Sequence, residues 1–105
     1  MVEEARREAE RLAEALRERG IRVEAVYLFG SVARGDFRLD SDFDLVIVSR
    51  DWEGIGYTER LDILYRLWRS PRDATLIPLT PRELSERLEK SVVLRDASRY
   101  WLRLL

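Results

Sequence analysis

Residues 30–48 read GSVARGDFRLDSDFDLVIV, and this stretch carries most of what the sequence says about the fold. A Gly-Ser pair is followed by ten residues and then by Asp42 and Asp44, which are one residue apart. The apolar run LVIV comes directly behind Asp44 and is typical of a buried strand. Because a buried carboxylate is costly unless something pairs with it, the stretch predicts a partner for the two aspartates.

The segments around this stretch predict a small α/β domain. Strands are expected over residues 21–29, 43–49 and 73–79, and helices over 3–19, 57–69, 81–90 and the tail from Ser91. Gly20 stands where a glycine often ends a helix, and TPRE at 80–83 is a capping box. Pro78 indicates either an edge strand or the end of a strand. This order predicts a mixed sheet of three or more strands with helices packed on it, in one domain over residues 1–105.

The tail carries an apolar stripe at helical spacing. The residues on this stripe are Val93, Ala97, Tyr100, Trp101 and Leu104. We expect a last helix that places the stripe in the core. The alternative is a surface for a second copy of the chain or for another partner protein.

Composition limits the chemistry that is open to this chain. The 105 residues include 19 basic and 20 acidic side chains, a net charge of −1, and neither cysteine nor histidine. The charge balance argues against nucleic acid as a partner, and a metal, if bound, should be a hard cation such as Mg²⁺ on oxygen ligands. The apolar runs are too short to span a membrane, and the charged N-terminus has no signal-peptide core, so we expect a cytoplasmic protein.

The spacing of residues 30–44 predicts a metal and phosphate site. Alternate residues of a strand share a face, so Asp42 and Asp44 present two carboxylates that repel each other unless a cation lies between them. Gly30 permits close backbone approach at a tight turn, and Ser31 adds a hydroxyl and an N–H group that suit a phosphate. Such a turn beside paired carboxylates is the arrangement for metal-assisted phosphoryl or nucleotidyl transfer.

Three other interpretations of this stretch compete with a transferase site. DSDFD at 40–44 resembles the start of an EF-hand calcium loop, but Leu45 stands where that loop needs glycine. Aspartate, serine and glycine are also common in turns, where Asp42 could pair with Arg34. Nucleic-acid binding through arginines is disfavoured because acidic residues match the arginines along the chain.

The pattern resembles a known family. GSVARGDFRLDSDFDLVIV is similar to the signature of the DNA polymerase β nucleotidyltransferase superfamily, and LIPLTPREL is similar to its third strand and following helix. The short length resembles the minimal nucleotidyltransferases (MNT), often encoded beside a HEPN-domain protein. The resemblance implies the polymerase β-like fold and transfer of AMP from ATP to an acceptor hydroxyl.

The resemblance also implies roles for individual residues. Gly30 and Ser31 would hold the β and γ phosphates, and Asp42 and Asp44 would bind Mg²⁺. The third carboxylate of the family acts as base or metal ligand, but Thr75 stands at its usual place, so we expect Asp73 to take the role. Further nucleotide contacts are expected from Arg34, Gly35 and Ser41.

The partner is likewise implied by the resemblance. The acceptor would be a tyrosine on a HEPN-type toxin, and this chain would be the antitoxin. The alternative is a weakened binding module that neutralises its partner by contact, an interpretation that rests on Thr75. Three further acids could contribute to the site, namely Asp36, Asp40 and Asp51.

Overall fold

Helices and strands alternate along the computed structural model, which describes residues 1–36, 38 and 41–105. The helices are α1 (Val2–Glu18), α2 (Gly30–Arg34), α3 (Tyr57–Leu67), α4 (Pro81–Lys90) and α5 (Val92–Ala97), with 3₁₀ turns η1 (Arg50–Trp52) and η2 (Ser98–Tyr100). The strands are β1 (Ala25–Phe29), β2 (Phe43–Val48), β3 (Ala74–Leu79) and β4 (Leu102–Arg103).

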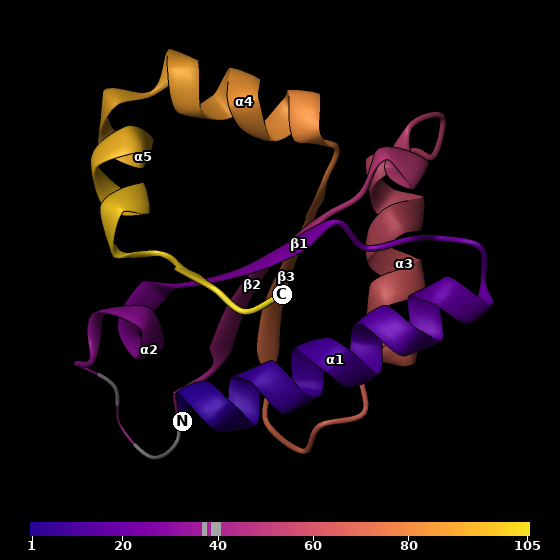
Figure 1. Ribbon diagram of the computed structural model, residues 1–105, viewed down its shortest axis with the longest axis horizontal. Coiled ribbons are helices and arrows are strands. Elements are labelled where there is room, and N and C mark those ends of the chain that lie inside the picture. Colours follow the sequence, from indigo (N-terminus) through magenta and orange to yellow (C-terminus); the bar gives the residue numbers. More distant parts are fainter. Residues whose placement is uncertain (37, 39–40) are drawn as a thin grey trace.

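In the described part of the chain, four strands form one mixed sheet in the order β3-β2-β1-β4 (Figure 1). β1 pairs antiparallel with β2 and with β4, whereas β2 and β3 run parallel. β2 is an interior strand because its residues after Asp44 are apolar on both faces and are all buried. The predicted mixed sheet, with β3 at an edge, is confirmed.

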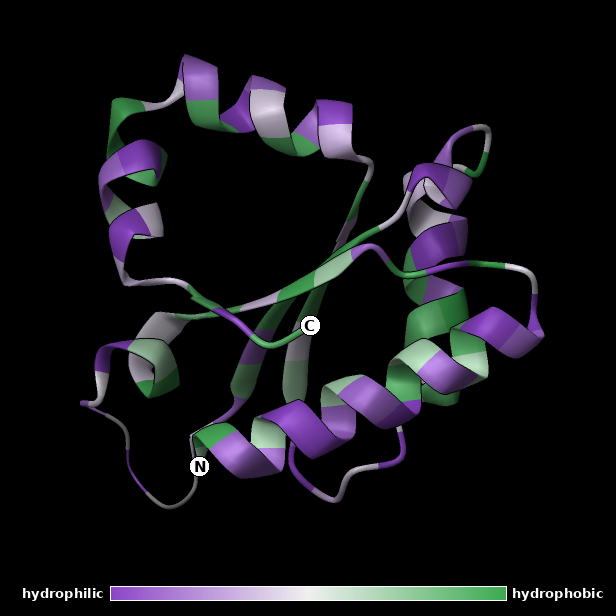
Figure 2. Ribbon diagram, viewed as in Figure 1, coloured by the Kyte–Doolittle hydropathy of each residue, from purple (hydrophilic) through white to green (hydrophobic). Residues whose placement is uncertain are grey.

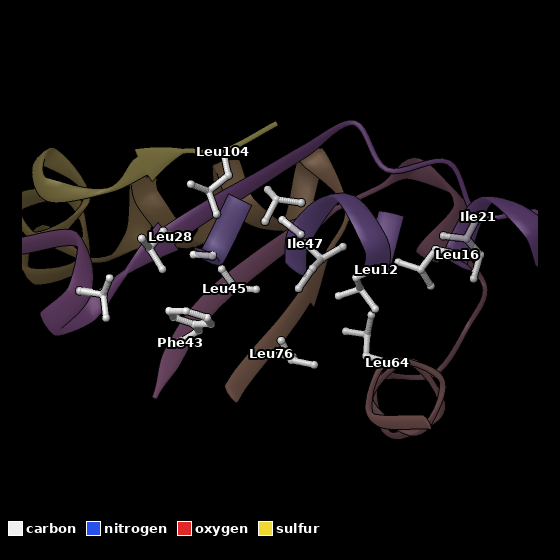
Figure 3. Close-up of a cluster of buried hydrophobic side chains, with 14 of the residues drawn as sticks. Leu12, Leu16, Ile21, Leu28, Phe43, Leu45, Ile47, Leu64, Leu76 and Leu104 are labelled. Atoms are coloured by element: carbon white, nitrogen blue, oxygen red, sulfur yellow. The ribbon is translucent and has the colours of Figure 1, made fainter. Parts of the chain in front are cut away.

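One face of the sheet is covered by α1 and α3, and the main core lies between these layers (Figure 3). Leu28, Leu45 and Ile47 belong to the same core cluster as Leu12 of α1 and Leu64 of α3. All five side chains are buried, so this layer contributes most of the hydrophobic stabilisation and holds the strands in place.

The opposite face of the sheet carries a smaller apolar cluster. Two of its buried members, Val46 and Leu79, pack with the partly buried Phe29, Leu84 and Trp101. Hydrophobic parts of α4 lie on its side toward the sheet (Figure 2). This is also the face of β2 that carries Asp44, because Asp44 and Val46 are two residues apart on one strand.

The outer edge of β3 is closed by side chains. The Tyr65 hydroxyl accepts a hydrogen bond from the Leu76 N–H at 3.0 Å and donates one to the Ala74 carbonyl at 3.1 Å. Pro78 has no N–H, and its carbonyl accepts a hydrogen bond from Arg60. These contacts leave few free backbone groups for pairing with another strand.

The predicted capping box at the start of α4 is confirmed. The Thr80 hydroxyl accepts a hydrogen bond from the Glu83 N–H, and the Glu83 carboxylate accepts one from the Thr80 N–H. Arg60 of α3 donates to the same carboxylate at 2.6 Å. The box therefore joins α4 to α3 as well as starting the helix.

The predicted last helix is wrong in its extent. α5 ends at Ala97, a 3₁₀ turn follows, and the chain then extends into β4 beside β1. Val93 is 81% exposed and Tyr100 is 60% exposed, whereas Leu104 is buried against β1. After the 3₁₀ turn, the chain pairs with the free edge of β1 instead of continuing as a helix. This is a tertiary contact, which the spacing of apolar residues within the tail cannot predict.

The other boundaries differ from prediction by a few residues, mostly at element ends. The largest difference is at residues 21–24, which were predicted as strand but precede β1. None of the helices in the described residues combines the length and apolar character that a bilayer crossing requires.

Candidate active site

The site is built around Asp44, which lies in β2 between two neighbouring strands. The strand register places Asp44 opposite Phe29 of β1 and beside Thr75 of β3. The side chain of Asp44 is partly buried and hydrogen-bonded to the side chain of Thr75. The sheet therefore holds this carboxylate from both sides.

The turn after β1 brings Gly30 directly over this carboxylate. Gly30 has a φ of +74°, and a Cβ on it would lie 2.1 Å from Oδ2 of Asp44. Only glycine fits, because a side chain there would be strained by the backbone angle and would overlap the carboxylate. The Gly-Ser turn and Asp44, separated in the sequence, thus meet in one place.

α2 holds the turn in position. Val32 is buried in the main core and anchors the helix. Gly35, with a φ of +83°, ends it in the left-handed conformation, and the Asp36 N–H donates to the Ser31 carbonyl at 3.2 Å. Ser31 itself is partly exposed at the turn.

Electrostatics disfavour the charged form of Asp44. Burial, followed by repulsion from Asp42, raises the pKa of the Asp44 carboxyl above its usual range. The hydrogen bond with Thr75 and the positive charge of Arg34 act in the opposite direction and do not cancel the effect. A cation bound between Asp42 and Asp44 would relieve both the repulsion and the desolvation of the carboxylates.

Asp42 lies just before β2 and is exposed. The loop before it is held by Ser41, whose hydroxyl accepts a hydrogen bond from the Arg38 N–H at 2.8 Å. The Ser41 carbonyl accepts one from Arg72 at 2.8 Å, and Arg72 also pairs with Glu4 of α1. Ser41 therefore supports the position of Asp42, in addition to the nucleotide contact predicted for it.

Asp73 precedes β3 and is exposed. Its carbonyl accepts a hydrogen bond from the Phe43 N–H at 3.1 Å, which brings its backbone level with that of Asp42. In the residues that the structure describes, however, no three acidic, histidine or cysteine side chains are grouped closely enough to hold a metal. Thr75, rather than Asp73, lies beside Asp44.

Of the three further aspartates that were predicted as possible contributors, two have other contacts and one lies outside the described residues. Asp36 pairs with Arg34 at 3.4 Å, and Asp51 accepts a hydrogen bond from the Arg22 N–H. Asp40 lies outside the described residues. From the sequence, Thr75 is only the residue that replaces the family's third acid. The register of β2 and β3 brings it beside Asp44, where the two side chains are hydrogen-bonded.

A cavity of about 390 Å³ adjoins the site on the same face of the sheet. Phe29, Val46 and Ile77 line it from the strands, and Trp101 lines it from the chain after η2. Gly30 and Arg34 of the phosphate-type turn also belong to its wall. Sequence reasoning missed this cavity because it depends on how the C-terminal segment folds back over the sheet.

The mixed sheet, the glycine turn and the paired aspartates define a nucleotidyltransferase-type domain. The family model described as "Nucleotidyltransferase domain" matches residues 9–99, and the chain belongs to this family. No curated protein matches the chain.

Two solved structures share the fold. A Sulfolobus solfataricus protein named as a candidate nucleotidyltransferase is 28% identical, with a TM-score of 0.62 over 82% of this chain and 72% of its own. A second structure, titled as a toxin-antitoxin with AMP-PNP, is 20% identical, with a TM-score of 0.60 over 91% of this chain and 71% of its own. The expected fold and family are thereby confirmed.

Proposed function

We propose that this chain is a Mg²⁺-dependent nucleotidyltransferase that moves AMP from ATP to an acceptor hydroxyl on a partner protein. The observation that carries the proposal is the placement of Gly30 against Asp44, with Asp42 two residues before Asp44 and close enough to repel its charge. A turn without a side chain beside two carboxylates leaves room for phosphate oxygens next to a metal site.

The donor set fits Mg²⁺. This ion is commonly bound by one or two carboxylates, with phosphate oxygens of the substrate completing the set. Asp42 and Asp44 would hold it. When bound, the ion would neutralise negative charge on the phosphates and polarise the phosphorus under attack.

The chain's own groups would orient the reaction. Ser31 and the Gly30 turn would hold the outer phosphates, and Arg34 would offset their charge. The acceptor oxygen would attack the α-phosphorus, the bond to the β-phosphate oxygen would break, and pyrophosphate would leave. Asp73 would accept the proton of the acceptor hydroxyl.

A role as antitoxin of a HEPN/MNT pair is part of the proposal. One support is the fold shared with a protein titled as a toxin-antitoxin with AMP-PNP, an ATP analogue. The expected acceptor is a tyrosine of the HEPN-type protein, and the expected compartment is the cytoplasm.

The test measures transfer of labelled AMP from α-labelled ATP to a co-expressed HEPN-type protein, with mass spectrometry of the product. Asp42→Asn and Asp44→Asn should each lower transfer at least about 100-fold because each removes a charged ligand. Asp62→Asn, on the exposed side of α3, is the matched control and should transfer normally. Undiminished transfer in both site variants would contradict the proposal.

A second candidate function is a binding module that neutralises its partner by contact. It is favoured by the position of Thr75 beside Asp44, where the family pattern would place an acid. This module would still hold Mg²⁺ and ATP, so millimolar Mg²⁺-ATP should raise the melting temperature without any AMP transfer. The absence of both effects would leave only a structural partner subunit.

A further inference from the structure

The cavity beside the proposed site is large enough for a nucleobase and its sugar. Ligand pockets in proteins usually enclose about 300–1,000 Å³, and this cavity encloses about 390 Å³. Its floor is the sheet face with Val46 and Ile77, and its walls include Leu84 of α4 and Ala97 of α5. Gly30 and Arg34 line the same cavity, so a ligand with its phosphates on the turn would extend into it.

The walls suit a flat aromatic ring. Trp101 packs in a tilted arrangement with Phe29 and Tyr27, with ring centroids 5.8 Å and 6.0 Å apart. Trp101 and Phe29 both line the cavity, together with aliphatic side chains. Stacking of a base on such a side chain depends little on which base is present, because every base has a π-face.

The side chains that line the cavity do not distinguish adenine from guanine by hydrogen bonding. Among the described lining residues, the polar side-chain groups are the guanidinium groups of Arg34 and Arg87, the Tyr100 hydroxyl and the Trp101 indole N–H, and no carboxylate or carboxamide is present. The 6-amino group of adenine needs an acceptor, whereas O6 and N7 of guanine accept hydrogen bonds of the kind that arginine donates. The Tyr100 hydroxyl can accept from the adenine amino group or donate to guanine O6, so the lining side chains provide nothing that would reject guanine.

We propose that this cavity binds the base of the donor nucleotide and selects it by stacking and size, so that it accepts guanine about as well as adenine. The inference rests on the proposed transferase function and concerns the nucleotide specificity of the same site. Selection without dedicated hydrogen bonds is weak, since sites that discriminate 10⁴-fold or more use buried polar partners.

Calorimetric titration of the full chain with ATP, GTP and inorganic tripolyphosphate, each with Mg²⁺, tests the proposal. ATP and GTP should bind within about tenfold of each other, and both should bind more than about tenfold tighter than tripolyphosphate. A larger preference for ATP over GTP would overturn selection by stacking. Equal affinity for ATP and tripolyphosphate would overturn base binding in the cavity.

Two variants locate the base. Ala97→Phe should fill the cavity and weaken ATP and GTP about tenfold while leaving tripolyphosphate unchanged, and Trp101→Leu should act in the same direction through lost stacking. Ala13→Phe, on α1 at the other side of the sheet, is the matched control and should bind all three ligands normally.

The results separate this inference from the proposed function. Unchanged ATP and GTP affinities in both cavity variants would overturn the inference while leaving the phosphate and metal site intact. If the unaltered chain binds neither tripolyphosphate nor ATP nor GTP, the proposed function is contradicted, and this inference with it.

Discussion

Gly30 and Asp44 lie so close that a Cβ on the glycine would stand 2.1 Å from the carboxylate oxygen Oδ2. Non-bonded heavy atoms are most favourable at about 3.5–4.0 Å, so no side chain fits between the two residues. The positive φ of Gly30 excludes other residues for a second, independent reason. The position of the Asp44 carboxylate therefore depends on the absence of a side chain at Gly30.

Gly30→Ala should disrupt both the site and the fold. We expect a loss of about 2–3 kcal/mol in the free energy of unfolding, from backbone strain and overlap with Asp44. Nucleotide affinity and transfer should fall together because Asp44 would be displaced. Thermal unfolding and calorimetry with Mg²⁺-ATP measure the two effects.

Gly20→Ala is the matched control for that substitution. Gly20 has a φ of +83°, but nothing lies within 4 Å of its Cβ position. The Gly20→Ala variant should lose only about 1 kcal/mol in the free energy of unfolding and should keep its affinity for nucleotide. Equal losses in the two variants would show that the contact with Asp44 adds nothing to backbone strain.

Asp44→Asn should stabilise the metal-free protein while preventing transfer. Burial and the charge of Asp42 disfavour the ionised carboxylate and raise the Asp44 pKa, so removal of its charge relieves a destabilising interaction. At pH 7 without metal, we expect a melting temperature a few degrees higher than that of the unaltered chain. Added Mg²⁺ should raise the melting temperature of the unaltered chain and have little effect on the variant. A lower melting temperature in the metal-free variant would contradict the electrostatic account.

Asp73 and Thr75 are distinguished by paired substitutions. If Asp73 is the base, Asp73→Asn should lower transfer by about 10²–10⁴-fold with little change in stability, because the side chain is exposed. Thr75→Asp should leave transfer similar or raise it, since it adds a carboxylate beside Asp44. Full transfer by Asp73→Asn would remove Asp73 from the mechanism.

Glu83 should give the stability of the chain a dependence on acid pH. The hydrogen bond from Arg60 is the largest cause that lowers the Glu83 pKa, and the Thr80 groups add to it. The ionised Glu83 carboxylate therefore stabilises the fold. This stabilisation is complete above the pKa of glutamate in the unfolded chain, about 4.3, and is lost as pH falls through the lower pKa of Glu83 in the folded chain.

Glu83→Gln measures that contribution. The variant should be less stable by about 1 kcal/mol at pH 7, a modest figure because the carboxylate is 38% exposed. The difference from the unaltered chain should narrow as pH falls below about 4.3, as followed by chemical denaturation. If the difference in the free energy of unfolding between the two proteins stays constant from pH 7 to below about pH 4.3, the stabilisation does not come from the ionised carboxylate of Glu83.

Local patterns predicted the parts of the fold that local physics dominates. α1 and α4 follow from amphipathic spacing and a capping box, and β2 follows from its apolar run. The tail was predicted less well. Its apolar residues fit a helix, but Trp101 packs on the aromatic rings of β1, and the Leu104 N–H donates to the Val26 carbonyl at 2.8 Å. These long-range contacts outweigh helical propensity.

The chemical groups that are available follow from the residues alone: a glycine turn, two alternate aspartates, and oxygen ligands without histidine or cysteine. The position of Thr75 beside Asp44, and the cavity that the C-terminal segment closes next to Gly30, arise from the folding of the whole chain. The reason is that the register of β2 and β3 and the path of the tail depend on packing between segments far apart in the chain. No periodicity within one segment specifies such packing.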